Sequence, residues 1–554
     1  MHKLPKCFLF TFLFTTFFVT GATATTHNAA SCNTSDVQNA INSAAAGDTV
    51  VIPAGTCTWT SGVNISKGIT IAGAGSGRII AISSSTLSLA AGSQTVTVQG
   101  TKVTCSSSCS LAAPAISTGQ TLTFYETGTT SNNMTGTVTS FNSGSGTLSM
   151  NFTSASGSCT PSAGSTVNCM RWMIATPSST VLINNSSTVM FNLTADTANH
   201  INVSGIKFQP GSGAGGAFFL NYTSGGKDIL IHDCWMEMGA AQTQPSIDST
   251  TNQGVVWNVS FDSSPFSLAA QFFRIKGAPN GWTSASTMGT ADTTGLSNFY
   301  VESSDIHAIL NSTDFDDNTR AVWRYNLQDN ASFTTHGSDT SNYGNRHFEI
   351  YNNVGVFEGY NSPPYYYTFN LANGWVFVRG GTFVFYNNNF PSLSSSDYGS
   401  KADLKLIVMN LQRNAGPNPC WGAGASNGQY YHAPRQIGMG YVTGTGKSSY
   451  SADGVNNAST DSITYVGDSE PAYIWGNRNA PANVVVTDYG PGNSNSCTGT
   501  VDSSANYLQN NRDYFNGSTA KPGWSPYTYP HPLTSGSGTA GTLNPPTGLA
   551  ASVQ

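Results

Sequence analysis

Short runs in which apolar and polar residues alternate recur through the middle of the chain. When the residues that end these runs are aligned, apolar residues usually lie two and four positions earlier, as Val203 and Ile201 do before Gly205. Two apolar positions separated by two residues give a strand one buried face. The intervals between runs vary, which suits coils joined by loops of unequal length, and the repeat predicts stacked parallel strands. The aligned run ends are Gly205, Asp233, Asn258, Ser303, Asn326, Asn352 and Asn387.

The N-terminal region adds a helix and a first coil to this pattern. Val37, Ala40 and Ile41 share one helical face and follow the capping residue Ser35. The chain then reads AGDTVVIPAGTCTW and, a few residues later, ISKGITIAGAG. These segments resemble the entry into bacterial pectate-lyase-like proteins. The resemblance implies an all-β fold, a right-handed single-stranded parallel β-helix of the pectin-lyase-like type with an N-terminal capping helix.

Composition divides the chain into segments. A basic start and an apolar run that ends at Val19 predict a cleaved signal peptide, hence a secreted, extracellular protein without a membrane span. A Ser/Thr/Gly-rich stretch of alternating strands is interpreted as a small inserted β module, and part of it resembles a module of phage tail proteins. The expected organisation is a signal peptide at 1–24, a cap and first coils at 25–87, the inserted module at 88–176, the main β-helix with its closing segment at 177–535, and a linker towards a further module at 536–554.

Charge and cysteine content narrow the chemistry. Charged residues make up 9% of the chain and its net charge is −6, which argues against nucleic acid or an anionic membrane as a partner. Ten cysteines in an exported chain favour disulfides. The expected pairs are Cys32–Cys57, Cys105–Cys109, Cys159–Cys169 and Cys420–Cys497, with Cys234 as a buried thiol.

Aromatic residues gather at the positions that alternate with the buried columns. Because neighbouring coils lie about 4.8 Å apart, these rings are expected to form one outer surface. Sugar rings stack on such surfaces, and Glu349 shares the register. The alternative is that a loop or the C-terminal tail covers the patch, because a large bare apolar face is rare. The predicted aromatic surface comprises Tyr300, Trp323, Tyr325, Tyr351 and Tyr386.

Three basic residues near this surface suggest chemistry on an acidic sugar. In the same alignment Arg320 and Arg346 fall at one register in successive coils, where two guanidinium groups repel unless an anion lies between them. A uronate carboxylate fits, since arginine binds carboxylates with two parallel bonds. An internal aspartate is the alternative. His336 follows as a candidate proton acceptor, whereas Arg324 occupies an apolar column and is expected to point inward and to be structural.

A local resemblance points to the same chemistry. Trp323-Arg324-Tyr325-Asn326 and His336-Gly337 resemble a stretch of the chondroitinase B and alginate lyase family, polysaccharide lyase family six. The resemblance covers about 20 residues and implies β-elimination on a uronic-acid polymer. This chain departs from the family at its catalytic arginine and lysine, where Thr335 and Asn318 stand.

Asp314 and Asp316 offer two weaker alternatives, an acid pair for hydrolysis or ligands for Ca²⁺. The leading hypothesis is a secreted monomeric carbohydrate-active enzyme, a lyase with Arg320, Arg346 and His336 in the reaction and an acidic polysaccharide as its substrate. A glycoside hydrolase and a non-catalytic adhesion protein that binds glycans are the alternatives.

Overall fold

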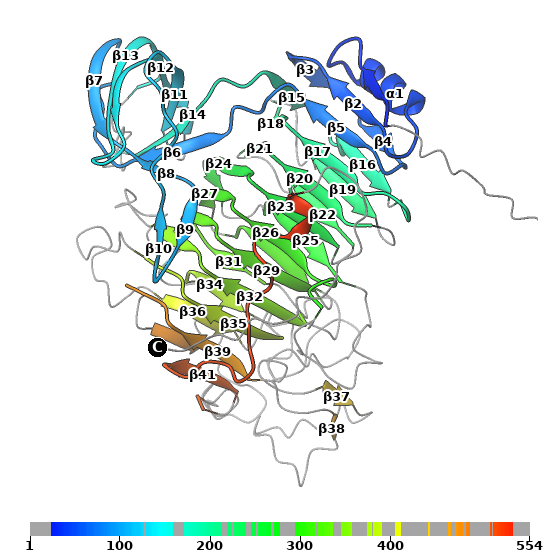
Figure 1. Cartoon of the computed structure of the whole chain (residues 1–554), viewed down its shortest axis with the longest axis vertical. Helices are drawn as coiled ribbons and strands as arrows, with labels where there is room; N and C mark the ends of the chain where they lie inside the picture. The colour runs from blue at the N-terminus through cyan, green and yellow to red at the C-terminus, as the bar shows by residue number, and fades with distance from the viewer. Residues whose placement is uncertain are drawn as a thin grey trace, which may run out of the picture.

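The chain is wound into coils whose strands stack into parallel sheets (Figure 1). In this computed structural model the described residues are 24–126, 129–158, 171–194, 196–211, 219–223, 227–239, 245–250, 253–267, 271–277, 294–309, 311–316, 319–335, 345–356, 374–378, 381–390, 405–410, 441–443, 464–466, 471–479, 483–487, 510–511 and 513–535. The predicted signal peptide, the cysteine pairs 159–169 and 420–497, and the 536–554 linker lie outside them, except for residue 24.

Three large sheets form the faces of the coil stack. Sheet A contains β1 (Thr26–Asn28), β2 (Thr49–Ile52), β5 (Thr70–Gly73), β17 (Ile201–Ser204), β20 (Ile229–His232), β23 (Gly254–Trp257), β26 (Phe299–Glu302), β29 (Arg320–Arg324), β32 (His347–Tyr351), β35 (Thr382–Tyr386), β39 (Ala472–Trp475) and β41 (Tyr514–Gly517). Sheet B contains β3 (Gly55–Trp59), β15 (Thr180–Asn184), β18 (Lys207–Pro210), β21 (Trp235–Met238), β24 (Ser260–Ser267), β27 (Asp305–Ile309), β30 (Leu327–Ala331) and β33 (Val354–Val356). Sheet C contains β4 (Val63–Ile65), β16 (Phe191–Thr194), β19 (Leu220–Thr223), β22 (Ile247–Ser249), β25 (Phe273–Lys276) and β28 (Thr313–Asp316).

Each complete coil contributes one strand to each sheet, as β23, β24 and β25 do in succession. Strands of neighbouring coils pair in parallel, so a coil rests directly on the one before it. Past sheet C, the stack continues in β31 (Phe333–Thr334), β34 (Val376–Val378), β36 (Lys405–Asn410) and β40 (Asn483–Thr487), while β37 (Tyr441–Thr443) and β38 (Thr464–Val466) form a separate antiparallel pair. The predicted right-handed parallel β-helix is confirmed.

The N-terminal cap also agrees with the sequence. Helix α1 (Thr34–Ser43) buries Val37, Ala40 and Ile41 against the first coils. The disulfide Cys32–Cys57 joins the segment before the helix to β3, as predicted. Cys234 is a buried free thiol, again as predicted. Within the described part of the chain, no helix is long and apolar enough to cross a bilayer.

The turn between sheets A and B sets the register of the coils. Its first residue has a positive φ in coil after coil, and the residues at this position are Gly205, Asp233, Asn258, Ser303, Tyr325, Asn352, Asn387 and Gly476. In the later coils the next residue is a buried asparagine that bonds to neighbouring coils. The Asn353 Nδ2 donates to Trp323 O at 3.0 Å, and its Oδ1 accepts from Asn326 N at 2.9 Å. This ladder satisfies backbone groups that the turn would otherwise leave unpaired.

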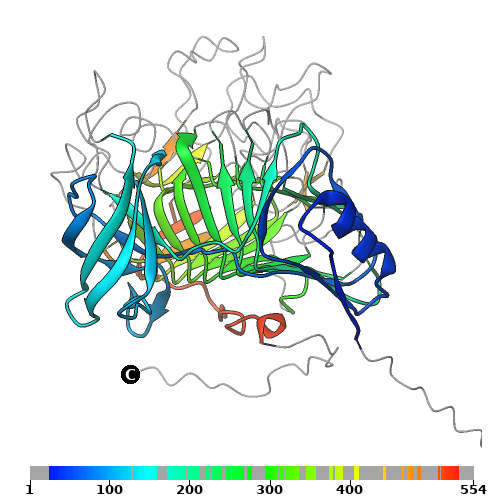
Figure 2. The ribbon, with the colours of Figure 1, turned by 90° about the horizontal axis from the view of Figure 1, so that it is seen from above.

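The inserted module is a separate antiparallel sheet with its own core of Leu122, Phe124 and other apolar residues. It starts earlier than the predicted boundary at residue 88, because β6 pairs with the last module strand. Figure 2 shows the module beside the stacked coils, away from α1. Its strands are β6 (Ile79–Ser83), β7 (Gly92–Thr97), β8 (Gln99–Gly100), β11 (Thr121–Glu126), β12 (Thr129–Asn142), β13 (Thr147–Ser156) and β14 (Trp172–Ala175).

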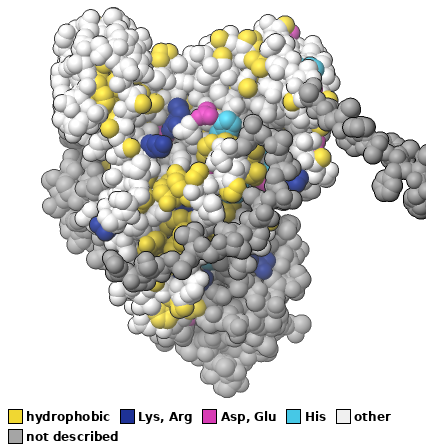
Figure 3. Space-filling view, viewed as in Figure 1, with side chains coloured by type: hydrophobic (Ala, Val, Ile, Leu, Met, Phe, Trp, Pro, Cys, Tyr) yellow, Lys and Arg dark blue, Asp and Glu magenta, His cyan; other side chains and the backbone are white. Residues whose placement is uncertain are grey.

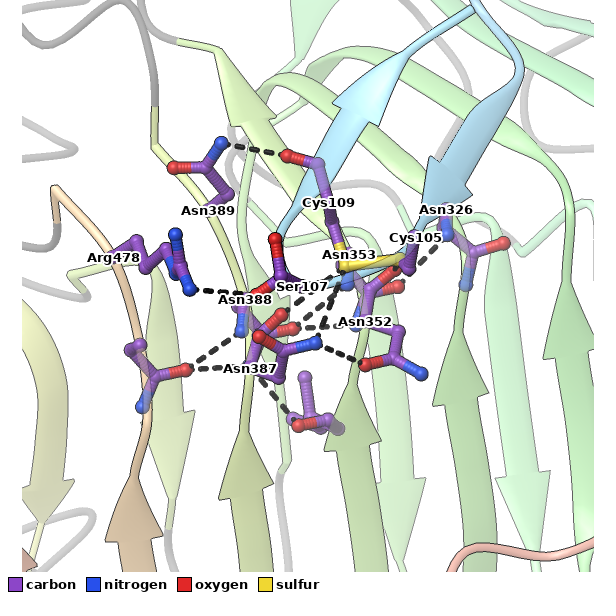
Figure 4. Close-up of a disulfide and its surroundings, with 12 residues drawn as sticks. Cys105, Ser107, Cys109, Asn326, Asn352, Asn353, Asn387, Asn388, Asn389 and Arg478 are labelled. Atoms are coloured by element: carbon purple, nitrogen blue, oxygen red, sulfur yellow. Dashed lines mark hydrogen bonds between the residues drawn. A yellow bond between two sulfur atoms is a disulfide. The ribbon is translucent and has the colours of Figure 1, made fainter. Parts of the chain in front are cut away.

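A disulfide-closed hairpin reaches from the module to much later coils (Figure 4). Strands β9 (Val103–Cys105) and β10 (Cys109–Leu111) are joined by the predicted Cys105–Cys109 disulfide. Asn389 Nδ2 donates to Cys109 O at 2.7 Å, and Arg478 Nη2 donates to Ser107 O at 2.7 Å. The hairpin thereby ties the module to the A–B turns of the later coils.

A buried ionic cluster joins the module to the outer face of sheet B. His307 donates to Asp305 Oδ2 at 2.8 Å and to Asp329 Oδ2 at 2.9 Å. Arg78, just before β6, lies 3.1 Å from Asp305, and Arg171, just before β14, pairs with Asp329. Because both arginines flank module strands, the ion pairs fix the module to the β-helix.

The same sheet face carries two further carboxylates and a lysine. Lys207 Nζ lies 3.0 Å from Glu237 and 3.5 Å from the centre of the Trp235 ring. Asp262, between Glu237 and His307 in register, is fully buried and neither carboxylate oxygen has a hydrogen-bond partner among the described residues. Burial and the Glu237 charge raise the pKa of Asp262 to about 7.

The contributions of Asp262 and His307 to the free energy of unfolding should therefore fall as the pH rises. Asp262 keeps its proton in the folded state up to about pH 7, whereas in the unfolded chain it titrates near its ordinary value of 3.8, so stability declines between these values. Burial opposes the charge on His307, but its bonds to Asp305 and Asp329 raise its pKa to about 9. Its contribution to the free energy of unfolding is therefore complete below pH 6.5 and is lost as the pH rises through about 9. Thermal unfolding midpoints across a pH series test this.

Asp262→Asn is the matched variant, because it fixes the neutral state at constant shape. We expect it to flatten the decline below pH 7 and to leave the decline towards pH 9 unchanged. An unaltered slope below pH 7 in Asp262→Asn would contradict the role of this carboxyl.

Candidate functional site

The predicted aromatic surface lies on the outer face of sheet A except for Trp323, and the chain's own C-terminal tail, residues 521–535, covers it. Tyr325 stacks on Tyr529 with ring centres 3.5 Å apart, and Tyr351 meets Trp524 edge to face at 5.6 Å. Tyr300 packs on the tail as well and is 2% exposed. Figure 3 looks onto the face that the tail crosses, where hydrophobic side chains gather. Of the two alternatives for these rings, coverage by the tail is confirmed.

Arg324 holds the tail in place. Its guanidinium group lies 2.7 Å from the Glu302 carboxylate and donates to the backbone oxygens of Tyr527 and Thr528, each at 2.8 Å. It also donates to the Tyr351 hydroxyl at 2.9 Å, and the other Glu302 oxygen accepts from the backbone of the tail. The ion pair is fully buried and every partner belongs to the fold or the tail, so Arg324 is structural, as expected.

The direction of Arg324 corrects the predicted alignment. Val301 pairs with Trp323 and Glu302 with Arg324, so the turn position of this coil is Tyr325 rather than Asn326. A shift of one residue exchanges the two faces of a strand. Arg324 therefore points outward, and Trp323 lies inside the β-helix, 1% exposed, where it packs on Phe273 and Phe333.

The predicted stack of two arginines is wrong for the same reason. Arg320 pairs in register with His347, and the backbone N–H of Arg346 bonds to Thr319 O. The two guanidinium groups therefore start from different positions in their coils. His336, the predicted proton acceptor, lies outside the described residues.

The corrected register brings together a different group of polar side chains near the corner between sheets C and A. Arg320, His347 and Thr382 follow one another on successive coils, with Glu349 two residues along the strand from His347. His347 Nδ1 lies 2.8 Å from Thr382 Oγ1, and His347 Nε2 lies 3.3 Å from Glu349 Oε1. The Arg320–His347–Glu349 cluster is the candidate functional site.

Several buried polar groups at this cluster have no hydrogen-bond partner among the described residues. Glu349 is 1% exposed and its Oε2 has no hydrogen-bond partner among the described residues. Asn298 and Asn345, which lie at the same corner, are 2% and 1% exposed, and neither side-chain amide has a partner within the described part of the chain. Buried amides and carboxylates without partners cost about 1–3 kcal/mol each, so a polar ligand that supplies partners is favoured here.

The charges of the cluster suit an acidic ligand. Burial lowers the pKa of His347 below its ordinary value against the effect of Glu349, and the charges of Lys521 and Arg320 lower it further. A neutral His347 can donate from Nε2 to Glu349 Oε1 while it accepts from Thr382, so the histidine does not bond to Glu349 Oε2. Arg320, with Lys521 from the tail, supplies the positive charge for a carboxylate.

The predicted aspartates lie on sheet C. Asp314 pairs in register with Arg274, whose pKa is raised chiefly by its hydrogen bond to Asp248 and further by the charge of the half-buried Asp314. The backbone of Asp316 belongs to β28, but its side chain lies outside the described residues. No group of three or more His, Cys, Asp or Glu side chains suited to a metal ion occurs among the residues that the structure describes. The Ca²⁺ and hydrolase hypotheses for this pair stay predictions.

Comparison with known proteins adds little about this site. No family model matches the chain. No curated protein matches it either. Similar solved structures include the tailspike gp61 of Pseudomonas phage phi297, with 12% identity over 65% of this chain and 67% of the tailspike and a TM-score of 0.14. The tailspike gp49 of Pseudomonas phage LKA1 gives 14% identity over 68% and 66%, with a TM-score of 0.22.

A third structure is the gp54 tailspike of Acinetobacter baumannii bacteriophage AP22 in complex with A. baumannii capsular saccharide, with 9% identity over 69% of this chain and 74% of that one and a TM-score of 0.13. At such TM-scores no residue of a tailspike can be matched to one of the Arg320–His347–Glu349 cluster. The assignment of the site therefore rests on its own geometry.

Removing Arg324 should strongly destabilise the protein. Arg324→Ala leaves the Glu302 carboxylate buried without its cation and frees the tail, so we expect a loss of about 3–5 kcal/mol in the free energy of unfolding. Urea denaturation measures this. Arg478→Ala is the control, because the Arg478 side chain is exposed and donates to the backbone oxygen of Ser107, so its loss should cost far less. Equal losses for the two variants would refute the tail-holding role.

Proposed function

We propose that the chain is an exported protein that binds and cleaves an acidic polysaccharide by β-elimination at the Arg320–His347–Glu349 cluster. The observation that carries this proposal is the buried Glu349 carboxylate, whose Oε2 has no hydrogen-bond partner among the described residues. It lies two residues from a histidine whose pKa is lowered, on the strand next to the one that begins with Arg320. Export is supported by two disulfides, Cys32–Cys57 and Cys105–Cys109, since such bonds persist in oxidising compartments.

The reaction needs a cation for the uronate carboxylate and a base for the proton on C5. Arg320 binds the carboxylate, which acidifies the C5 proton by stabilising the charge that develops there. Glu349 Oε2 accepts this proton, while His347 bonds to the other oxygen of the same side chain, Glu349 Oε1. The C5–H electrons form the C4=C5 double bond as the C4–O bond breaks. The proton then passes to the departing oxygen, so the products are an unsaturated sugar and a free hydroxyl group.

Glycan binding without cleavage is the second candidate, and one residue favours it. Thr335 stands where the lyase family that the sequence resembles has its catalytic arginine. Its side chain is buried, and its backbone N–H bonds to Phe377 O at 2.9 Å. The elimination described for Arg320 and Glu349 does not use that position. The two candidates differ in their product, because only elimination releases an unsaturated sugar.

Arg320→Ala should lower turnover of an acidic polysaccharide about 10²–10³-fold, because it removes the group that stabilises developing charge. Glu349→Gln should do the same, since a neutral amide cannot accept the proton. Ultraviolet absorbance of the unsaturated product and reducing ends are followed together on alginate, polygalacturonate, chondroitin and hyaluronan. Arg478→Ala is the matched arginine control, and thermal unfolding verifies that each variant folds.

The two readouts separate the candidates. Reducing ends without absorbance would indicate hydrolysis, and binding without either signal would support the non-catalytic candidate. Because burial lowers the pKa of His347, it stays neutral to a lower pH than an ordinary histidine, so activity should persist further into the acid range. Full turnover by both variants would exclude this site.

A further inference from the structure

The outer face of sheet C differs from the other two large faces. Sheet A is covered by the tail, and sheet B meets the module through the buried ionic cluster. On sheet C buried and exposed residues alternate, with mostly apolar residues inside and polar ones outside, as in Phe191-Asn192-Leu193 and Phe273-Arg274-Ile275. The described outward side chains on this face are all polar and remain partly or fully exposed.

These outward residues form one continuous column. Asn64, Asn192 and Asn221 are joined by side-chain hydrogen bonds of 3.0 and 3.3 Å. Arg274 follows with two bonds to Asp248, at 2.9 and 2.6 Å. The register continues from Asn221 to Asp248, then to Arg274 and Asp314. Six rungs at about 4.8 Å give a track about 24 Å long.

The chemistry of the column selects its ligand. A protein partner needs an apolar centre to its interface, and the described outward positions of sheet C offer none. The backbone groups of these strands already pair with the strands on each side. A partner peptide therefore cannot bind by adding a strand between them. Amide, carboxylate and guanidinium groups at regular spacing instead match the hydroxyl groups of an extended sugar chain.

The column also leads to the candidate site. Asp314 lies on β28, and the same coil continues into β29, which begins with Arg320. Along the column, two aspartates flank one arginine, which keeps its two bonds to Asp248, and the other rungs are neutral. Carboxylates on every sugar would meet Asp248 and Asp314 at close range, and juxtaposed like charges are costly.

We propose that the outer face of sheet C is a binding track for an extended polysaccharide in which charged sugars are separated by neutral ones. The track delivers this chain to the Arg320–His347–Glu349 cluster, and in that respect the inference rests on the proposed function. Neutral sugars lie along the Asn64–Asn192–Asn221 rungs, and Arg274 faces a spaced carboxylate.

The test compares hyaluronan, in which uronate alternates with a neutral amino sugar, with polygalacturonate, in which every sugar is charged. Affinity electrophoresis of the full chain in gels that contain each polymer gives the dissociation constants. We expect tighter binding to hyaluronan, and a loss of about tenfold in the double variant Asn192→Ala/Asn221→Ala, which removes hydrogen bonds at two rungs. Thr95→Ala/Ser149→Ala removes a similar exposed polar pair from the module and should change nothing.

Three results would overturn the track: wild-type affinity in the Asn192/Asn221 double variant, equal or tighter binding of polygalacturonate, or no binding of either polymer. Failure of the proposed function is a separate outcome. If Arg320→Ala turns substrate over normally while the double variant loses affinity for hyaluronan, the track stands and the catalytic assignment falls. If Arg320→Ala is inactive while the double variant binds normally, the reverse holds.

Discussion

The architecture depends on the turn that links sheets A and B. In each of eight positions the first turn residue has a positive φ, and it sends the chain from one face to the next with the same geometry. In the later coils a buried asparagine follows, and its amide bonds the turns of neighbouring coils to one another. Because this column fixes where each strand of sheet A ends, it decides which side chains enter the core and which face outward.

That dependence explains what could be predicted from the sequence. In β17 and β20 apolar residues lie two and four positions before a residue that accepts a positive φ, so the fold and most buried positions could be predicted from the sequence. The turn position of Tyr325 could not be predicted, because a bulky residue with a positive φ is a genuine exception. Its ring stacks on Tyr529, some 200 residues later in the chain, and a local pattern carries no sign of that contact.

The candidate site could be predicted only in part from the sequence, for the same reason. Arg320 and Glu349 were selected, but His347 was missed, since only the corrected register places it on the coil next to Arg320. The signal was present in the chain as an aligned pair of polar residues at the start of two successive strands. Asn298 and Asn345 gave no such signal, because a missing hydrogen bond is a property of three-dimensional packing.

The outward side chains of the three large sheets find their partners in three different ways. Sheet A presents rings and valines, and the tail buries them around the Arg324–Glu302 pair. Sheet B presents ions, and the module supplies Arg78 and Arg171 as partners. Sheet C presents amides and charges that water or a hydroxyl-rich ligand can satisfy, so it needs no cover from the chain itself.

The hairpin closed by Cys105 and Cys109 bears on how the molecule assembles. Its partners Asn389 and Arg478 come roughly 280 and 370 residues later in the chain. A chain that leaves the ribosome or the export channel N-terminus first therefore makes the module long before the coils on which this hairpin rests. Such distant contacts form late in folding. The hairpin can therefore dock only after the coils that carry Asn389 and Arg478 have stacked, so its docking marks a late step of folding.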